Sequence, residues 1–210
     1  MQLQRRNRFI LAALIALGWD ARAAEEGFVS LVRGDDPQQF DLVDIGPDTI
    51  KIDNGEIRLT GRPDGYFATK ESYKNYVLTF EWMYERPSDL ESDAKFKGNS
   101  GLLLHLTPPH KVWPRCVEAQ LQNHDAGHLF AIMGAKFQGS KDAAAQEKAI
   151  RPVGRWNLEE VTCRDGKIRC KINGIEVSSG TGATPDHGQI GWQSEGAPIR
   201  FRDLKIKVLD

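Results

Sequence analysis

The sequence predicts an all-β fold, a two-sheet antiparallel sandwich or jelly roll with one short helix. Apolar and polar residues alternate along many short segments, as in strands that bury one face. Tight-turn dipeptides, Asn54-Gly55 and Asp165-Gly166 among them, separate pairs of these segments. Only residues 141–150 have the composition of a helix. Many short strands separated by turn residues are typical of sandwiches and jelly rolls.

The chain opens with a segment that we expect to be removed. Arg5, Arg6 and Arg8 precede the apolar run FILAALIALGW, and the small residues of ARAA follow. This order is typical of a secretory signal peptide. The run is shorter than the about 20 residues that span a membrane, although retention as an amphipathic anchor is an alternative. We expect residues 1–24 to be a signal peptide and residues 25–210 to be one secreted or periplasmic domain.

The expected strands are segments in which apolar and polar residues alternate. They lie within residues 49–61, 76–85, 100–107, 116–122, 159–174 and 199–209. Residues 85–98 interrupt the pattern because they are charged and contain Pro87, so we predict a solvated loop there. The alternation of Asp89, Glu91 and Asp93 resembles a calcium loop, but Ala94 stands where an EF-hand needs Gly.

Charge and cysteine content exclude several classes of function. The formal net charge of −1 gives no sign of a nucleic-acid partner. Three cysteines are too few for a disulfide scaffold, and their spacing does not indicate zinc. Cys163 and Cys170 flank the Asp165-Gly166 turn and share a face of the expected hairpin. Either a disulfide or two buried thiols would fit, and Cys116 would be unpaired.

The strand expected at residues 116–122 has one apolar and one polar face. Because strand side chains alternate, Glu118, Gln120 and Gln122 face away from Val117, Ala119 and Leu121. In residues 100–107, Gly101, Leu103 and His105 are expected on one face by the same rule. If the two strands are neighbours, His105 shares a face with Glu118.

This polar face has two interpretations. A solvated sheet face is one, but such a face is usually rich in Lys, Glu and Thr. A sugar site is the other, because amides and carboxylates pair with hydroxyls and indole rings stack on sugar rings. We favour the sugar site, given the residues expected nearby. These are Asn99, Trp113, His124, Asp125 and His128.

Seven segments follow one another along the chain: GFVSLVRGDD, IKIDNGEIRLTG, YKNYVLTFEWM, GNSGLLLHL, WPRCVEAQLQNHDAG, VGRWNLEEVTCRDGKIRCKINGIEV and GQIGWQSEGAPIRFRDLKI. In this order they make the chain resemble the 3-keto-disaccharide hydrolase domain family. The resemblance implies a secreted concanavalin-like jelly roll that acts on glycosides oxidised at C3. Trp192, Asp203 and His128 depart from the residues usual in the family, which leaves the specificity open.

The cleavage of a 3-keto-glycoside that this resemblance implies needs few catalytic side chains. A C3 ketone acidifies the C2 hydrogen, so the group on C1 can leave by elimination before water adds. We assign Glu118 as general base or metal ligand, with His105 or His124 as its acid–base partner. Arg202 would stabilise Glu118 or the enolate, unless it forms a salt bridge that stabilises the fold.

The remaining assignments are contacts with the substrate, a glycoside or oligosaccharide. These are Asn99, Trp113, Gln120, Gln122, Asp125, Trp192 and Gln193, with a core position as the alternative for Trp192. A divalent cation bound by Glu118, His105 and Asp125 is a further option, although no ligand spacing specifies it. The main rival function is a non-catalytic carbohydrate-binding module. An ordinary glycosidase needs two carboxylates, and only Glu118 is placed on this face.

Overall fold

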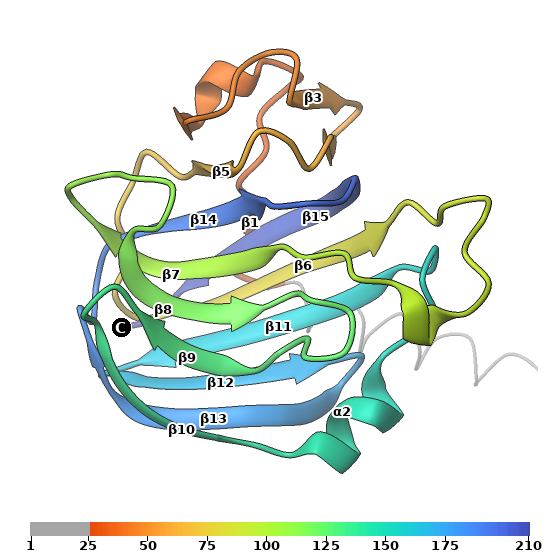
Figure 1. Ribbon diagram of the computed structural model, residues 1–210. Coiled ribbons are helices and arrows are strands. Elements are labelled where there is room, and N and C mark those ends of the chain that lie inside the picture. Colours follow the sequence, from red (N-terminus) through yellow and green to blue (C-terminus); the bar gives the residue numbers. More distant parts are fainter. Residues whose placement is uncertain (1–25) are drawn as a thin grey trace, which may run out of the picture.

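Two antiparallel sheets pack face to face in the computed structural model, which describes residues 26–210 (Figure 1). The large sheet has the order β10 (Lys136–Lys141), β13 (Ile175–Thr184), β12 (Lys167–Ile172), β11 (Asn157–Arg164), β6 (Tyr76–Tyr84), β15 (Ile199–Val208), β4 (Glu56–Leu59) and β3 (Ile50–Asp53), and β1 (Val29–Ser30) also pairs with β15. The small sheet has the order β2 (Asp41–Val43), β5 (Gly65–Ala68), β14 (Gln189–Ser194), β7 (Gly101–Thr107), β8 (Arg115–Gln120) and β9 (Leu129–Ile132). The predicted fold class is confirmed. The expected signal peptide lies outside the described residues.

The helical segments are short. The predicted helix is α2 (Ala143–Ala149), which begins where the Asp142 carboxylate accepts a hydrogen bond from the Ala145 N–H at 2.9 Å. The short 3₁₀ helices η1 (Pro37–Gln39) and η2 (Asp93–Lys95) lie in connections between strands. None of the helices in residues 26–210 is long and apolar enough to cross a lipid bilayer.

The core lies between the sheets because each strand contributes alternate side chains to it. Along β6, buried residues alternate with half-buried ones, and Phe80 and Trp82 are among those in the core. Trp192 of β14 is also fully buried and stacks on Phe67 with ring centroids 5.1 Å apart. Its expected place at the substrate is therefore wrong, and the core alternative is correct.

The turns and the cysteines follow the sequence pattern. Asn54 and Gly55 both have positive φ, as a two-residue turn between β3 and β4 requires. Asp165-Gly166 makes the equivalent turn between β11 and β12. Cys163 and Cys170 lie in the same buried cluster and are free thiols, which is the second of the two arrangements considered.

The loop between β6 and β7 uses an acidic residue to hold the fold. The Asp93 carboxylate accepts a hydrogen bond from the Val153 N–H at 2.9 Å and pairs with the Arg86 guanidinium. These contacts lower the pKa of Asp93, with the Arg86 hydrogen bond as the largest cause. These contacts hold the β6–β7 loop against the segment that precedes β11. The Asp93 carboxylate therefore has a structural role.

Candidate functional site

Glu118 lies on the outer face of the small sheet, as its strand pattern predicts. Val117 and Ala119 point into the core, whereas Glu118 stands opposite Leu103 of the neighbouring strand β7. The next outward position of β7 is Gly101, which pairs with Gln120. The predicted adjacency of β7 and β8 is confirmed.

Gly101 creates the space in which two polar side chains meet. A Cβ added to this glycine would lie less than 3.0 Å from both Glu118 Oε1 and Gln193 Oε1. Gln193 belongs to β14, on the other side of β7 from Glu118. The carboxyl and the amide therefore reach toward each other across the bare backbone of Gly101.

Burial makes the Glu118 carboxyl an unusually weak acid. The residue is only 5% exposed, and burial, with a smaller contribution from Glu195, raises the pKa of its carboxyl to about 8. Glu118 therefore holds its proton at neutral pH. A carboxyl with a pKa near the working pH suits acid–base catalysis.

Glu195 is a second carboxyl that the sequence assignments missed. It follows β14 directly and is half-buried, and burial raises its pKa while a hydrogen bond with Asn99 lowers it. Isolated bridges join Asn99 to Glu195 and Gly196. The signal was present, because Gln193 and Glu195 are two residues apart and strand alternation predicts a shared face.

Polar atoms in this cluster lack partners. Among the described residues, the Gln193 Oε1 and Nε2 atoms and the Asn99 Oδ1 atom are buried without a hydrogen bond. Unpaired buried polar groups cost free energy, so we expect bound water or a ligand to satisfy these atoms. We call Glu118, Glu195, Gln193 and Asn99 the carboxyl-pair site.

His105 does not share the face of Glu118, so this expectation is wrong. His105 has a φ of 60°, and the β7–β8 register shifts between Leu104 and Thr107. This bulge inverts the alternation, so the His105 ring packs edge-on against Tyr76 in the core, with centroids 5.7 Å apart. Burial there lowers the pKa of His105 to about 4.

Arg202 lies on the large sheet and has other partners. Its Nε donates to Glu81 Oε2 at 2.6 Å, and its guanidinium lies 4.1 Å from the centroid of the Trp156 ring. Its expected interaction with Glu118 is therefore wrong. The alternative is confirmed, because Arg202 forms a salt bridge between two strands of the large sheet.

The turn after β8 uses its polar residues mainly for its own structure. Gln120 Oε1 accepts the N–H groups of Leu121 and Gln122, both at 2.9 Å. Asp125 pairs with His128 at 3.0 Å and also with Lys141 of β10. Gln122 and His124 are exposed, and His124 is close enough to Asp93 to lower its pKa. Trp113 is 40% exposed on the β7–β8 connection.

The expected metal ligands do not form one set. Glu118 points outward from the small sheet, His105 packs in the core, and Asp125 is paired with His128 and Lys141. Residues 26–210 contain no group of three or more His, Cys, Asp or Glu residues that could hold a metal ion. The carboxyls and amides are the groups that this site offers to a ligand.

The fold and the site together define the class of protein: a jelly roll that carries a pair of carboxyls on the outer face of one sheet. The family model described as the 3-keto-alpha-glucoside-1,2-lyase-like domain matches residues 18–207. The chain belongs to this family.

Solved structures are similar in fold. Two candidate glycosyl hydrolases from Parabacteroides distasonis ATCC 8503 match, the first with 20% identity, a TM-score of 0.67, and coverage of 90% of this chain and 97% of the other. The second has 19% identity, a TM-score of 0.64, and coverage of 87% and 99%. Carbohydrate binding module CBM66 from Bacillus subtilis has 9% identity, a TM-score of 0.51, and coverage of 86% and 95%. No curated protein is similar enough in sequence to be matched.

Gly101→Ala is expected to damage the site and spare the fold. The new methyl group would displace the flexible ends of Glu118 and Gln193 and not the backbone. We expect the midpoint of thermal unfolding to change by only a few degrees. Turnover of the glycoside substrate should fall about 100-fold, because a small displacement of the groups that contact it is enough to cause such a loss. Gly46→Ala is the matched control, because a Cβ at Gly46 meets nothing within 4 Å. Full activity in Gly101→Ala would contradict the placement of the site.

Proposed function

We propose that the protein is an exported enzyme that cleaves glycosides oxidised to a ketone at C3, with Glu118 and Glu195 as its acid and base. The observation that carries this proposal is the buried Glu118 carboxyl, neutral up to about pH 8, beside a second carboxyl and the unpaired Gln193 amide. Family membership supports the same substrate class, since the family is described as 3-keto-alpha-glucoside-1,2-lyase-like.

The two carboxyls divide the proton transfers between them. Glu118 keeps its proton at neutral pH, so it supplies the acid, and the more exposed Glu195 supplies the base. Glu195 removes the C2 proton, which is acidic because the carbanion delocalises into the C3 carbonyl. The electron pair then forms the C1–C2 double bond, the C1–O bond breaks, and the leaving oxygen takes the proton of Glu118. Addition of water to the resulting enone completes hydrolysis.

The amides bind and orient the sugar in this proposal. The Gln193 Nε2 group is a donor without a partner, so it can hydrogen-bond to the C3 oxygen as negative charge develops there. The Asn99 Oδ1 atom accepts from a sugar hydroxyl. Arg202 has no part in this scheme, because it is held by Glu81 on the large sheet.

A non-catalytic carbohydrate-binding role is the second candidate. The observation in its favour is that neither histidine expected beside Glu118 belongs to the carboxyl-pair site, and a binding site needs only the amides and carboxyls. Glu195 also restores the pair of carboxyls that an ordinary glycosidase requires. The three functions differ in whether a sugar is cleaved and in which sugar it is.

The test compares a 3-keto-disaccharide with its unoxidised parent. We expect sugar release from the keto compound alone, detected by chromatography, with deuterium from solvent appearing at C2. Binding of either sugar without release would establish the carbohydrate-binding role and overturn the enzyme proposal. Release from the unoxidised parent at an equal rate would indicate an ordinary glycosidase.

A further inference from the structure

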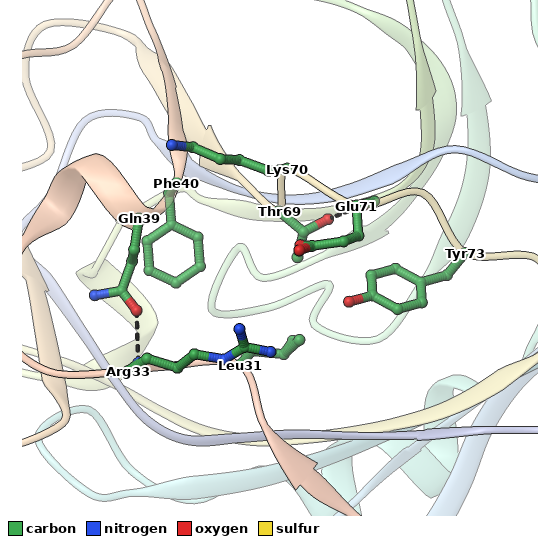
Figure 2. A pocket seen from close by; sticks show the side chains of 8 residues that line it. All are labelled: Leu31, Arg33, Gln39, Phe40, Thr69, Lys70, Glu71 and Tyr73. Carbon is green, nitrogen blue, oxygen red and sulfur yellow. Dashed lines mark hydrogen bonds between the residues drawn. The ribbon is translucent and has the colours of Figure 1, made fainter.

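A pocket lies at the end of β5 that is distant from the carboxyl-pair site. Residues 31–40 and the segment Thr69–Tyr73 after β5 enclose about 80 Å³ of space (Figure 2). Gly65 at the start of β5 pairs with Ser194, next to Glu195, whereas Ala68 at its end pairs with Gly191. The pocket begins beyond Ala68, so β5 separates it from the carboxyl-pair site.

Three polar groups converge on this space. Figure 2 shows the Arg33 guanidinium, the Glu71 carboxylate and the Tyr73 hydroxyl directed toward the same cavity. Arg33 and Glu71 are exposed and Tyr73 is half-buried, and within residues 26–210 none of the three side-chain groups forms a hydrogen bond with another protein group. The Lys70 ammonium extends away from the cavity (Figure 2). One cation, one anion and one hydroxyl are thus left available to a ligand.

The backbone that carries these groups is fixed by hydrogen bonds. Gln39 Oε1 accepts the Arg33 N–H at 2.6 Å (Figure 2), and Gln39 Nε2 donates to the Asp36 carbonyl at 2.7 Å. Thr69 Oγ1 donates to the Glu71 carbonyl at 2.8 Å. Tyr73 exchanges two backbone hydrogen bonds with Gly188, at 2.8 and 3.0 Å. Such support fixes the backbone positions from which the Arg33, Glu71 and Tyr73 side chains extend, so a ligand does not have to order the backbone.

An apolar wall completes the pocket. The Phe40 ring faces the cavity (Figure 2) and is held edge-on against Phe67 with centroids 5.0 Å apart. Leu31 lines the cavity as well. The pocket therefore combines an aromatic wall with donors and an acceptor, a composition that suits an amphipathic ligand.

We propose that this pocket binds a single sugar residue, separately from the carboxyl-pair site. A guanidinium donates two parallel hydrogen bonds and a carboxylate accepts two, so Arg33 and Glu71 match neighbouring hydroxyls on a ring. A simple anion would be repelled by Glu71 and a simple amine by Arg33, whereas a neutral polyol satisfies both. The enclosed volume of about 80 Å³ is smaller than a whole pyranose, so only the edge of one ring enters the pocket and the rest of the sugar lies outside it. The proposal does not depend on the catalytic role of Glu118.

The test follows backbone and Arg33 side-chain N–H signals by nuclear magnetic resonance. Methyl α-glucoside, methyl β-glucoside and methyl β-galactoside are titrated separately into the labelled protein, and sodium sulfate serves as the anionic probe. We expect at least one glycoside to shift Arg33 and residues 69–73 at millimolar concentration. Arg33→Gln, Glu71→Gln and Tyr73→Phe should each weaken binding about tenfold.

Two control variants separate this site from the others. Lys51→Gln should bind with unchanged affinity, because Lys51 is exposed on β3 and does not line the pocket. Glu118→Gln should also leave these shifts unchanged, whatever happens to sugar cleavage. Shifts of residues 69–73 by sulfate but by none of the glycosides would overturn the proposal in favour of an anion site. No shift with any probe would overturn it entirely.

Discussion

Glu118→Gln is expected to lower the turnover of a 3-keto-disaccharide about 1,000-fold, within the range that loss of a general acid produces. The fold should persist, because the amide has nearly the same shape and the carboxyl it replaces is already neutral at pH 7. The loss should be much smaller, about tenfold or less, for a 3-keto-glucoside with a nitrophenyl leaving group. That leaving group needs little protonation, so a proton donor contributes little to its departure.

The pH profile of kcat/KM supplies an independent readout for the same variant. An acid works only while protonated, so the activity of the unaltered protein should fall as pH rises through about 8. Glu118→Gln should lack this alkaline decline. Glu160→Gln is a matched control, since Glu160 pairs with Lys171 on the large sheet. An unchanged alkaline decline in Glu118→Gln would show that another group supplies the proton.

Glu159→Gln is expected to change how stability depends on pH. Glu159 is fully buried in the core, where Trp82 Nε1 donates to its carboxyl at 3.1 Å and the Cys170 thiol at 3.5 Å. Burial raises its pKa from 4.5 to about 8. The folded protein thus keeps this proton up to about pH 8, whereas the unfolded chain releases it near pH 4.5.

The sign of the effect follows from proton binding. Between pH 4.5 and 8 the unfolded chain binds fewer protons at this residue, so the free energy of unfolding falls by about 1.4 kcal/mol per pH unit. The loss accumulates to roughly 5 kcal/mol at pH 8 and above. Glu118 contributes a decline of the same sign.

Urea unfolding at several pH values measures this decline. Glu159→Gln should make the slope shallower by up to about 1.4 kcal/mol per pH unit in that interval. Its stability at pH 4.5 should be lower than that of the unaltered protein, because one amide N–H group has no acceptor in the core. Glu160→Gln, the adjacent residue on the opposite face of β11, should leave the slope unchanged. Equal slopes in all three proteins would contradict a neutral, buried Glu159.

Local pattern was enough to predict the strands within six ranges, including those of β6, β7, β8 and β15, and the outward direction of Glu118. It missed others, such as β5, β9 and β14. Side chains alternate along a strand whatever its neighbours are, so the contrast between Val117 and Glu118 survives in the folded protein. The Asn54-Gly55 turn is similarly local, because its positive φ angles depend on two residues. Helix α2 was predicted from the composition of residues 141–150, and it lies within that range.

The site required information that alternation does not contain. The bulge at His105 adds one residue to the register and reverses every later direction in β7, and no residue type in the segment signals it. Arg202 was misplaced because alternation gives a side chain's face but not the sheet to which its strand belongs. Glu195 follows the same alternation as Gln193, so predicting a strand over residues 189–195 would have placed both side chains on one face.

Hydrogen exchange at C2 of a 3-keto sugar without a leaving group tests the proposed chemistry most directly. A 1,5-anhydro-3-keto-glucitol in deuterated water isolates the removal of the C2 proton from bond cleavage, and nuclear magnetic resonance follows the loss of its C2 signal. We predict rapid exchange with the unaltered protein and with Glu118→Gln, and exchange at least 100-fold slower with Glu195→Gln. Absence of catalysed exchange in the unaltered protein would contradict the account, and the carboxyl-pair site would then be a site for binding sugars alone.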